Sequence, residues 1–296
     1  MGQRYEKDIF FVDVVWIGEA GATKTDWIEL STGRLLRTEG LNAEIEGWEQ
    51  AAQKLQIAAC HFQREGLTIN QLHYYGPALH QPKSREFMRR LLSEAFGISV
   101  DAISVYHDLI GAARAAWGTQ KGIVGILGTG SNCALWDGTH IQKQAGGHGY
   151  LLGDEGGGAD LGRNFLSALL HGEVPAEVEA AFWQENPYPE AQTPLELRSL
   201  TYRTQRPSAF LGGFAPFLSR WQQHPWVEAL VRERIRRFIQ RTWYSWRQEA
   251  AIRYVGGVAQ AFQKLVQEET ERIGGIWAGV VPNVGVALLT YHRQYG

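Results

Sequence analysis

The chain has 296 residues, which is enough for two domains of the common size of about 150 residues each. Hydrophobic residues make up 44% of it and charged residues 20%, as in globular proteins with a large core. The formal net charge of −2 gives no basic surface for nucleic acid, and no apolar run approaches the roughly 20 residues of a membrane-spanning helix. Two cysteines, Cys60 and Cys133, are too few for a disulfide framework or a metal cluster, which fits a reducing compartment.

The first predicted strand is the apolar stretch IFFVDVVWIG, residues Ile9 to Gly18. Arg4 and Lys7 before it and the small residues AGA behind it resemble a secretion signal with its cleavage site. Asp8 and Asp13 interrupt the apolar stretch, however, and a secretion signal tolerates such charges poorly. We therefore expect a buried strand, no export and a cytoplasmic protein.

The stretch IGEAGATKTDW, from Ile17 to Trp27, differs at one position from the phosphate loop G-x-x-x-x-G-K-[ST], because Thr23 replaces the second glycine. A loop of that kind leads into a helix, whose N-terminus helps to bind the anion. Here a second extended run follows, and the turn residues from Ser31 to Gly33 separate it from a third. The sequence therefore predicts a loop between two strands of a hairpin.

The next segment predicts a helix from Trp48 to Glu65, because Ala51, Leu55, Ala58 and Phe62 recur on one helical face. The further predicted elements are, in chain order, a strand and loop (Leu72–Leu79), a helix that a serine caps (Ser84–Phe96), a short strand (ISVYHD), a helix ending in glycine (Leu109–Gly118), a mainly helical stretch (Gly162–Arg247), and a strand, double glycine and helix (Ile252–Glu269).

A second hairpin is predicted in GIVGILGTGSNCALWDGTHI, from Gly122 to Ile141. An apolar strand enters a turn of glycine, threonine and serine, a second strand leaves it, and Asp137-Gly138 forms the next hairpin turn. This order of elements repeats that of the first hairpin. The chain is thus predicted to consist of two related α/β halves, each with one phosphate-binding hairpin.

Five arginines recur at helical spacing in the second half. They are Arg232, Arg234, Arg236, Arg237 and Arg241, and they alternate with apolar residues. This pattern is typical of the solvent-exposed face of a helix rather than of a surface for nucleic acid.

Three stretches together resemble a known family: GATKTDW, HDLIGAARA with GILGTGSNCALWDG, and GYLLGDEGGGADLG. They are similar to the N-acetylglucosamine kinase-like group of the BadF/BadG/BcrA/BcrD-type ATPases, within the actin–hexokinase–Hsp70 superfamily. A fourth stretch, YVGGVAQAF, resembles the adenosine-side loop of that group. The resemblance extends from about Ile9 to His292 and is weakest between Val174 and Ile252.

The resemblance implies a duplicated actin-like, ribonuclease H-like α/β fold with a nucleotide cleft between two domains. The first domain, residues 1–116, would hold the sugar side and the first phosphate loop. The second, residues 117–296, would hold the second phosphate loop and the adenosine loop, and the last helix would pack back on the first domain. The implied activity is transfer of a phosphoryl group from ATP, with Mg²⁺, to the 6-hydroxyl of N-acetylglucosamine or a related amino sugar. The implied protein is a cytoplasmic homodimer that binds neither nucleic acid nor membrane.

Phosphoryl transfer depends on positioning and on neutralising charge, and glycine-rich turns let backbone N–H groups approach phosphate oxygens. Each hairpin alone would more often be an ordinary turn, but the matched pair favours phosphate binding. The predicted phosphate-binding residues are Gly21, Ala22, Thr23, Lys24, Thr25, Gly128, Thr129, Gly130, Ser131 and Asn132. Gly256 and Gly257 would bind adenosine, or else form a close turn between a strand and a helix.

Asp108 follows a predicted strand and precedes a predicted helix. Aspartate is a common N-cap, so this residue has a structural role available to it. The matching motif of the family implies instead a general base, which would accept the proton of the sugar hydroxyl as that oxygen attacks the γ-phosphate. The two roles are compatible.

The sugar site is predicted from the resemblance alone. Asp154 in the turn GDEGGG would face the sugar hydroxyls, and Glu155 would position it or a metal-bound water; capping of the following helix is the alternative role of both. His148 stands where the compared sugar kinase has a large aromatic residue, which leaves the identity of the sugar open. The remaining predicted sugar-binding residues are Asn42, Gly76, Gly149 and Tyr150.

Glu19 departs from the family pattern, which has aspartate before the first phosphate loop to orient a Mg²⁺-bound water. Glutamate keeps the charge but adds a methylene group, and Mg²⁺ requires nearly ideal octahedral geometry. A kinase with weakened catalysis, or a sugar-binding sensor without it, therefore remains an alternative. Another is the ATPase activator of a radical dehydratase or reductase, although neither cysteine is placed for a cluster shared between subunits.

Overall fold

The computed structural model describes residues 14–296, and within them the chain forms two five-stranded sheets. The first contains β1 (Val15–Ala20), β2 (Lys24–Glu29), β3 (Leu35–Glu39), β4 (Gln71–Gly76) and β5 (Ile103–His107) in the order β3-β2-β1-β4-β5. The second contains β6 (Gly122–Leu127), β7 (Ser131–Trp136), β8 (Ile141–Gly146), β9 (Ile252–Val255) and β10 (Trp277–Val281) in the order β10-β9-β6-β7-β8. The part of the predicted first strand before residue 14, with Asp8 and Asp13, lies outside the described residues.

The two sheets have the same topology. In the first, β1 pairs antiparallel with β2 and parallel with β4; in the second, β6 pairs antiparallel with β7 and parallel with β9. The outer strands continue the pattern, with β3 and β8 antiparallel and β5 and β10 parallel to their neighbours. The duplicated actin-like α/β fold predicted from the sequence is therefore confirmed, and so are both hairpins.

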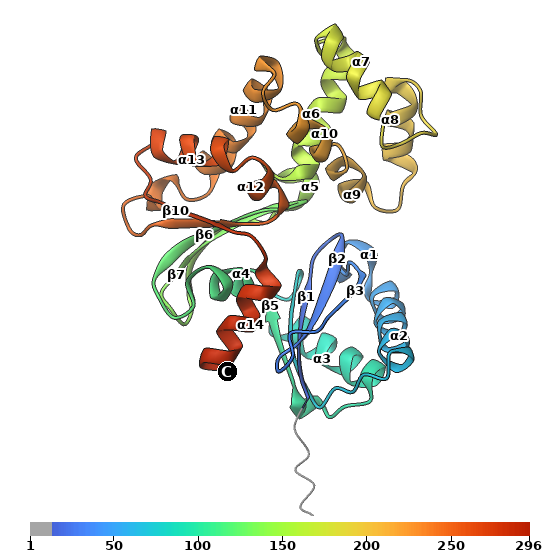
Figure 1. Cartoon of the computed structure of the whole chain (residues 1–296), viewed down its shortest axis with the longest axis vertical. Coiled ribbons are helices and arrows are strands. Elements are labelled where there is room, and N and C mark those ends of the chain that lie inside the picture. The colour runs from blue at the N-terminus through green and yellow to red at the C-terminus, as the bar shows by residue number, and fades with distance from the viewer. Residues whose placement is uncertain (1–13) are drawn as a thin grey trace, which may run out of the picture.

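Helices cover the first sheet and dominate the end of the molecule beyond the second (Figure 1). The first half contains α1 (Ala43–Glu46), α2 (Trp48–Arg64), α3 (Pro82–Phe96), the short helix η1 (Val100–Ala102) and α4 (Asp108–Trp117). The second half contains α5 (Gly149–Leu152), α6 (Gly158–His171), α7 (Ala176–Glu185), α8 (Pro194–Arg203), α9 (Pro207–Gly212), α10 (Ala215–Arg220), α11 (Pro225–Arg241), η2 (Tyr244–Trp246), α12 (Gly257–Ala261), α13 (Gln263–Arg272) and α14 (Val284–Tyr295).

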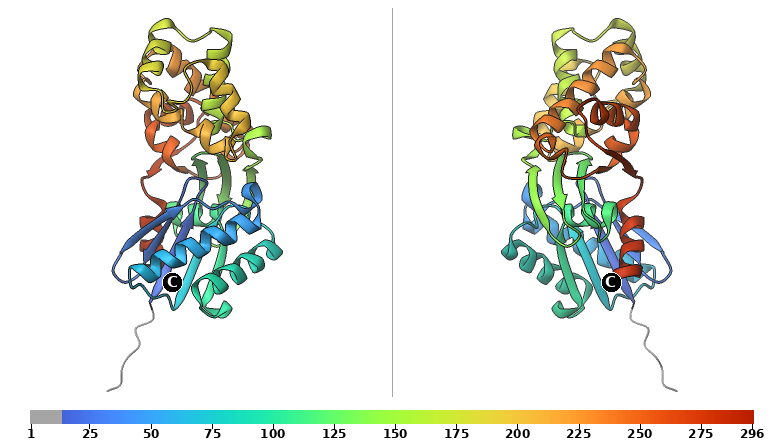
Figure 2. Two further views of the ribbon diagram at one scale, coloured as in Figure 1. Left: turned by 90° about the vertical axis from the view of Figure 1, so that its right-hand side faces the viewer. Right: turned by 90° about the vertical axis from the view of Figure 1, so that its left-hand side faces the viewer.

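The core of the first sheet is aromatic. Trp16 and Trp27, on neighbouring strands, both contact Phe62 of α2, with ring centroids 4.6 and 5.8 Å apart. The apolar face predicted for this helix is buried against them, and α3 lies beside α2 on the same side of the sheet (Figure 2). Stable packing of this kind fixes the ends of β1 and β2, from which the first hairpin projects.

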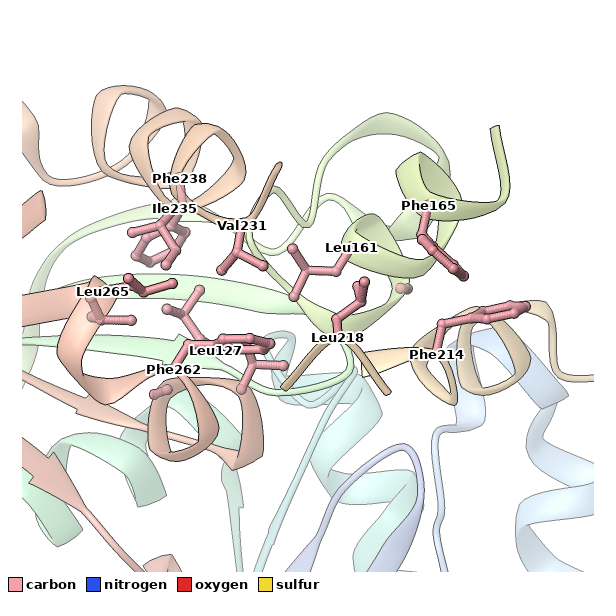
Figure 3. Packing of buried hydrophobic residues seen from close by; sticks show 14 of the residues in the cluster. Leu127, Leu161, Phe165, Phe214, Leu218, Val231, Ile235, Phe238, Phe262 and Leu265 are labelled. Atoms are coloured by element: carbon pink, nitrogen blue, oxygen red, sulfur yellow. The ribbon is translucent and has the colours of Figure 1, made fainter. Parts of the chain in front are cut away.

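A larger apolar core holds the helices of the second half on their sheet. Leu127 of β6 lies among side chains of α6, α10, α11 and α13, and Figure 3 shows Phe238 and Phe262 on opposite sides of this cluster. The loop of the second hairpin starts directly after Leu127, so this core fixes the point from which the loop projects.

Two helices connect the halves. Leu109 and Ala113 of α4 pack on the second sheet, whereas Leu288 of α14 packs against Ile17 of β1. The last helix thus contacts the first half, as Figure 1 also shows. The boundary predicted between residues 116 and 117 stays a prediction; it falls within the last turn of α4.

Three local predictions were wrong. The N-cap of α3 is Gln81, followed by Pro82, rather than Ser84, because proline is favoured in the first turn of a helix. The helix predicted after the double glycine is two helices, which meet at Phe262. Among the arginines of α11, Arg234 is largely buried in a two-pronged ion pair with Asp160, at 2.7 and 3.1 Å, so this face is only partly solvated.

No helix in residues 14–296 is long and apolar enough to cross a lipid bilayer.

Candidate active site

A cavity of about 1360 Å³ lies between the two halves of the molecule. The turn between β1 and β2 and the turn between β6 and β7 both line it, together with the loop from β9 into α12 and with helix α5. These segments are far apart in the sequence, and the duplicated topology places them around one space. A cavity of this size accommodates a nucleotide and a second small molecule.

The first hairpin loop is closed by its own backbone. The N–H of Gly21 donates to the carbonyl of Lys24 at 2.8 Å, and the N–H groups of Gly40 and Leu41 donate to Thr23 and Gly21 at 3.2 and 3.1 Å. Residues 21–24 line the cavity. Thr25 does not: it is buried, and its hydroxyl donates to the carbonyl of Glu39. Four of the five predicted phosphate-binding residues of this loop thus face the cavity.

The second hairpin loop rests on the beginning of α6. The N–H of Gly158 donates to the carbonyl of Gly128 at 2.8 Å, and that of Ala159 donates to Thr129 at 2.9 Å. All five predicted residues of this loop, from Gly128 to Asn132, line the cavity. The positive end of the α6 dipole adds to the attraction for an anion here.

The two loops meet across the cavity. The hydroxyl oxygens of Thr23 and Thr129 are 3.2 Å apart, although 106 residues separate them in the chain. Hydroxyl and backbone N–H donors from both halves can therefore approach the same group of anionic oxygens.

Asp108 lines the cavity as the first residue of α4. The N-cap is the preceding His107, whose Nδ1 accepts a hydrogen bond from the N–H of Leu109 at 3.3 Å. The capping role considered as the alternative for Asp108 is therefore filled by His107, whose Nδ1 also lies 3.2 Å from Oδ1 of Asp108. Burial raises the pKa of Asp108, partly offset by the nearby His107, and its buried Oδ1 has no hydrogen-bond partner among residues 14–296. A raised pKa makes a carboxylate a stronger base.

Glu19 also lines the cavity, near the end of β1 and opposite Asp26 in the strand register. Burial raises the pKa of Glu19 to about 7; the negative charge of Asp26 adds to this effect, and Lys24 opposes it. Asp26 itself is held by Lys24 and Arg37, each with a nitrogen 2.6 Å from a carboxylate oxygen. Of these two carboxylates, Glu19 makes no hydrogen bond or ion pair within the described residues, so it is the one available to a cation.

The predicted sugar-side residues divide into two groups. Asn42, His148, Gly149, Tyr150 and Asp154 line the cavity. Asn42 also caps α1, since its Oδ1 accepts from the N–H of Glu44 at 3.2 Å, and Asp154 accepts from the N–H of Ser131 at 3.2 Å and so supports the second hairpin.

Gly76 and Glu155 do not line the cavity. A side chain at Gly76 would meet the Tyr74 ring, and the neighbouring Pro77 and Ala78 line the cavity in its place. The Glu155 carboxylate forms an ion pair with Arg241. Its position next to Asp154 in the sequence therefore does not make it part of the cavity wall.

Gly256 and Gly257 both line the cavity at the beginning of α12. Gly256 has φ +107°, and a Cβ atom there would lie 2.4 Å from the carbonyl oxygen of Leu127, so no other residue fits without a shift. This close approach is the structural role considered for the pair. A Cβ atom at Gly257, by contrast, would meet nothing within 4 Å, so there is open space at this residue.

Several cavity residues had not been predicted. They include His80, His107, Ser219, Gln260 and Asn283, and the rings of the two histidines have centroids 6.2 Å apart. The dipeptide His107-Asp108 was visible in the sequence as a pair of titratable residues. The others come from separate helices and loops, and nothing in the local sequence distinguishes them.

The duplicated sheets with a shared cavity define the class of protein. No protein-family model and no curated protein matches the chain. Among solved structures, a Chromobacterium violaceum protein provisionally named N-acetylglucosamine kinase has a TM-score of 0.67 at 21% identity, covering 95% of this chain and 99% of that one. A Streptomyces griseus glucokinase of the ROK family, in complex with glucose and AMPPNP, has a TM-score of 0.56 at 14% identity, covering 93% and 98%. At these identities, the two likenesses show the fold alone.

A third structure gives the family. A Porphyromonas gingivalis protein, provisionally named N-acetylglucosamine kinase, is 30% identical over 95% of this chain and 99% of that chain, with a TM-score of 0.81. The chain belongs to this family of sugar kinases. The narrower grouping with the BadF-type ATPases stays a prediction.

Proposed function

We propose that the protein transfers the γ-phosphoryl group of ATP to the 6-hydroxyl of N-acetylglucosamine or a related amino sugar. One observation carries the proposal: two glycine-rich hairpins meet at one cavity that is also lined by a desolvated carboxylate, Asp108. The similarity to a protein provisionally named N-acetylglucosamine kinase supports the choice of sugar.

Each group of residues has a role in this reaction. The hairpin loops hold the phosphates of ATP through N–H and hydroxyl donors, and Gly256 and Gly257 make room for the adenosine. Asp108 accepts the proton of the sugar hydroxyl as the oxygen attacks phosphorus. Asn42, Asp154 and the segment from His148 to Tyr150 contact the sugar.

The residues at the first hairpin fit a magnesium ion that arrives with ATP. Mg²⁺ in such sites is bound by one or two carboxylates together with substrate phosphates, and residues 14–296 contain no cluster of three metal-binding side chains. Glu19, which lines the cavity wall and has no ion pair with any residue from 14 to 296, supplies one carboxylate, directly or through a water molecule. When bound, the ion would neutralise charge on the transferred phosphoryl group. A cation at Glu19 would also lower the pKa of that carboxyl, which burial raises.

The alternative of an ATPase activator gains no support from the cysteines. Cys60 is exposed on α2, far along the chain from the hairpins, and Cys133 is buried within β7, where burial raises the pKa of its thiol. A thiol in that state is a poor ligand for an iron–sulfur cluster. The homodimer and the cytoplasmic location stay predictions.

A panel of sugars with Mg-ATP tests the proposal. We expect ADP release that depends on an N-acetylated amino sugar and exceeds the release with glucose or without sugar. A folded sample that releases ADP at the same rate with and without every sugar of the panel would contradict it.

A further inference from the structure

An arginine from the second half of the molecule reaches the first phosphate hairpin. Arg206 precedes α9, and its Nη2 donates to the carbonyl oxygen of Ala22. Its Nη1 donates to Oε1 of Glu39 at 2.8 Å. These contacts bridge 184 and 167 residues of sequence. The guanidinium therefore joins the two halves at the loop that lines the cavity.

The loop that Arg206 holds is already braced from its own side. A Cβ atom at Gly40 would lie 2.6 Å from the backbone of Gly21 and Ala22, so the strand end packs directly on the hairpin turn. Lys54 ties this strand end down, donating to the carbonyl of Gly40 at 3.0 Å and lying 3.3 Å from Glu39. Arg206 thus donates hydrogen bonds to both parts of a unit formed by the hairpin turn and the end of β3.

The helix behind Arg206 reaches the second hairpin. Ser208 and Gly212 of α9 line the cavity, and a Cβ atom at Gly212 would contact the Thr129 side chain at 3.2 Å. Figure 1 shows α9 facing the end of the first sheet near α1, away from α4 and α14, which connect the halves elsewhere. Helix α9 and its N-cap Arg206 together therefore contact both phosphate hairpins.

We propose that Arg206 is a cross-cleft positioning residue for the phosphoryl transfer: its guanidinium holds the first hairpin at the distance at which both hairpins bind one nucleotide. This inference rests on the proposed function. The ion pair with Glu39 alone would contribute little, because the two side chains are 35% and 53% exposed. The contact with the Ala22 carbonyl distinguishes this arginine, since the planar guanidinium presents two N–H donors in a fixed arrangement and the flexible ammonium group of lysine does not.

The test compares Arg206→Gln with Arg203→Gln, which makes the same charge change at an exposed arginine of α8 without an ion pair among the described residues. Binding of AMPPNP, an ATP analogue, is measured by calorimetry, and KM for ATP and kcat are measured with the sugar. We expect Arg206→Gln to weaken AMPPNP binding and raise KM for ATP about tenfold, as for loss of a hydrogen bond to a charged group. Arg206→Lys should restore part of this loss, Glu39→Gln should cost about threefold, and Arg203→Gln should match the wild type.

Equal AMPPNP affinity, within twofold, for the wild type, Arg206→Gln and Arg203→Gln would overturn the inference. If Arg206→Gln does not fold, Arg206→Lys and Glu39→Gln decide by the same measurement. A wild type that binds AMPPNP but shows no sugar-dependent turnover would refute the proposed function, while the binding comparison would still test the role of Arg206. A wild type that does not bind AMPPNP would overturn both.

Discussion

Acid should destabilise the protein through a histidine buried where α14 packs on the first sheet. His292 is 4% exposed and stacks on His73 with ring centroids 4.1 Å apart, and its Nε2 lies 2.8 Å from the hydroxyl of Tyr75. Arg114 of α4 donates to the same hydroxyl at 2.8 Å. Burial, with the neighbouring His73 and Arg114, lowers the pKa of His292 to about 3, from an ordinary value of 6.5.

The sign and the size of the effect follow from this shift. Below pH 6.5 the unfolded chain binds a proton at His292 that the folded protein does not accept until about pH 3. The contribution to stability is therefore complete above pH 6.5 and falls as the pH decreases through this window. At pH 5, which is 1.5 pH units below 6.5, the free energy of unfolding is lower by about 2 kcal/mol. For a chain of 296 residues this corresponds to a decrease in Tm of about 3 °C.

The perturbation is His292→Gln, because the glutamine amide retains a partner for Tyr75 and does not titrate. Tm is measured by calorimetry at pH 7.5 and pH 5 for the wild type, for this variant and for His171→Gln, a control at an exposed position. The decrease in Tm between the two pH values should be about 3 °C smaller in His292→Gln than in the wild type or the control. If Tm decreases by the same amount in all three proteins between pH 7.5 and pH 5, His292 is not a neutral buried group.

Three further predictions concern the cavity and the cysteines. Asp108→Asn should retain the Kd for AMPPNP but lose about 10²–10⁴-fold in kcat, and a native rate would show that it is not the base. Gly130→Ala would place a Cβ atom 2.6 Å from Oδ2 of Asp154, so calorimetry should show weakened AMPPNP binding; unchanged affinity would argue against this loop as a phosphate site. A thiol reagent should modify Cys60 in the native protein and reach Cys133 only after unfolding, and rapid labelling of both would contradict the buried position of β7.

The parts of the fold that could be predicted have local causes. Each hairpin follows from an apolar strand, a turn of small residues and a second strand, and the repeat of this order indicated the duplication. The helix of Trp48 follows from one apolar face. The capping residue of a helix is harder to predict, because several residues near a helix start can serve as the cap. The path of the backbone selects Gln81 for α3, and it selects His107 rather than Asp108 for α4.

The parts of the site that could not be predicted depend on contacts between distant segments. Glu155 is adjacent in sequence to a cavity residue, but Arg241, 86 residues away, pairs with it outside the cavity wall. Arg234 meets Asp160 across 74 residues, and Arg206 meets Ala22 across 184. A single sequence contains no local signal for such pairs, because they exist only once the helices of the second half have packed.

The identity of the product shows most directly whether the protein phosphorylates an amino sugar. The protein is incubated with Mg-ATP and N-acetylglucosamine, and the mixture is analysed by phosphorus NMR and mass spectrometry. We expect one 6-phosphorylated sugar for each ADP formed, with Asp108→Asn forming neither at a comparable rate. ADP that accumulates together with inorganic phosphate and without a sugar phosphate would contradict it.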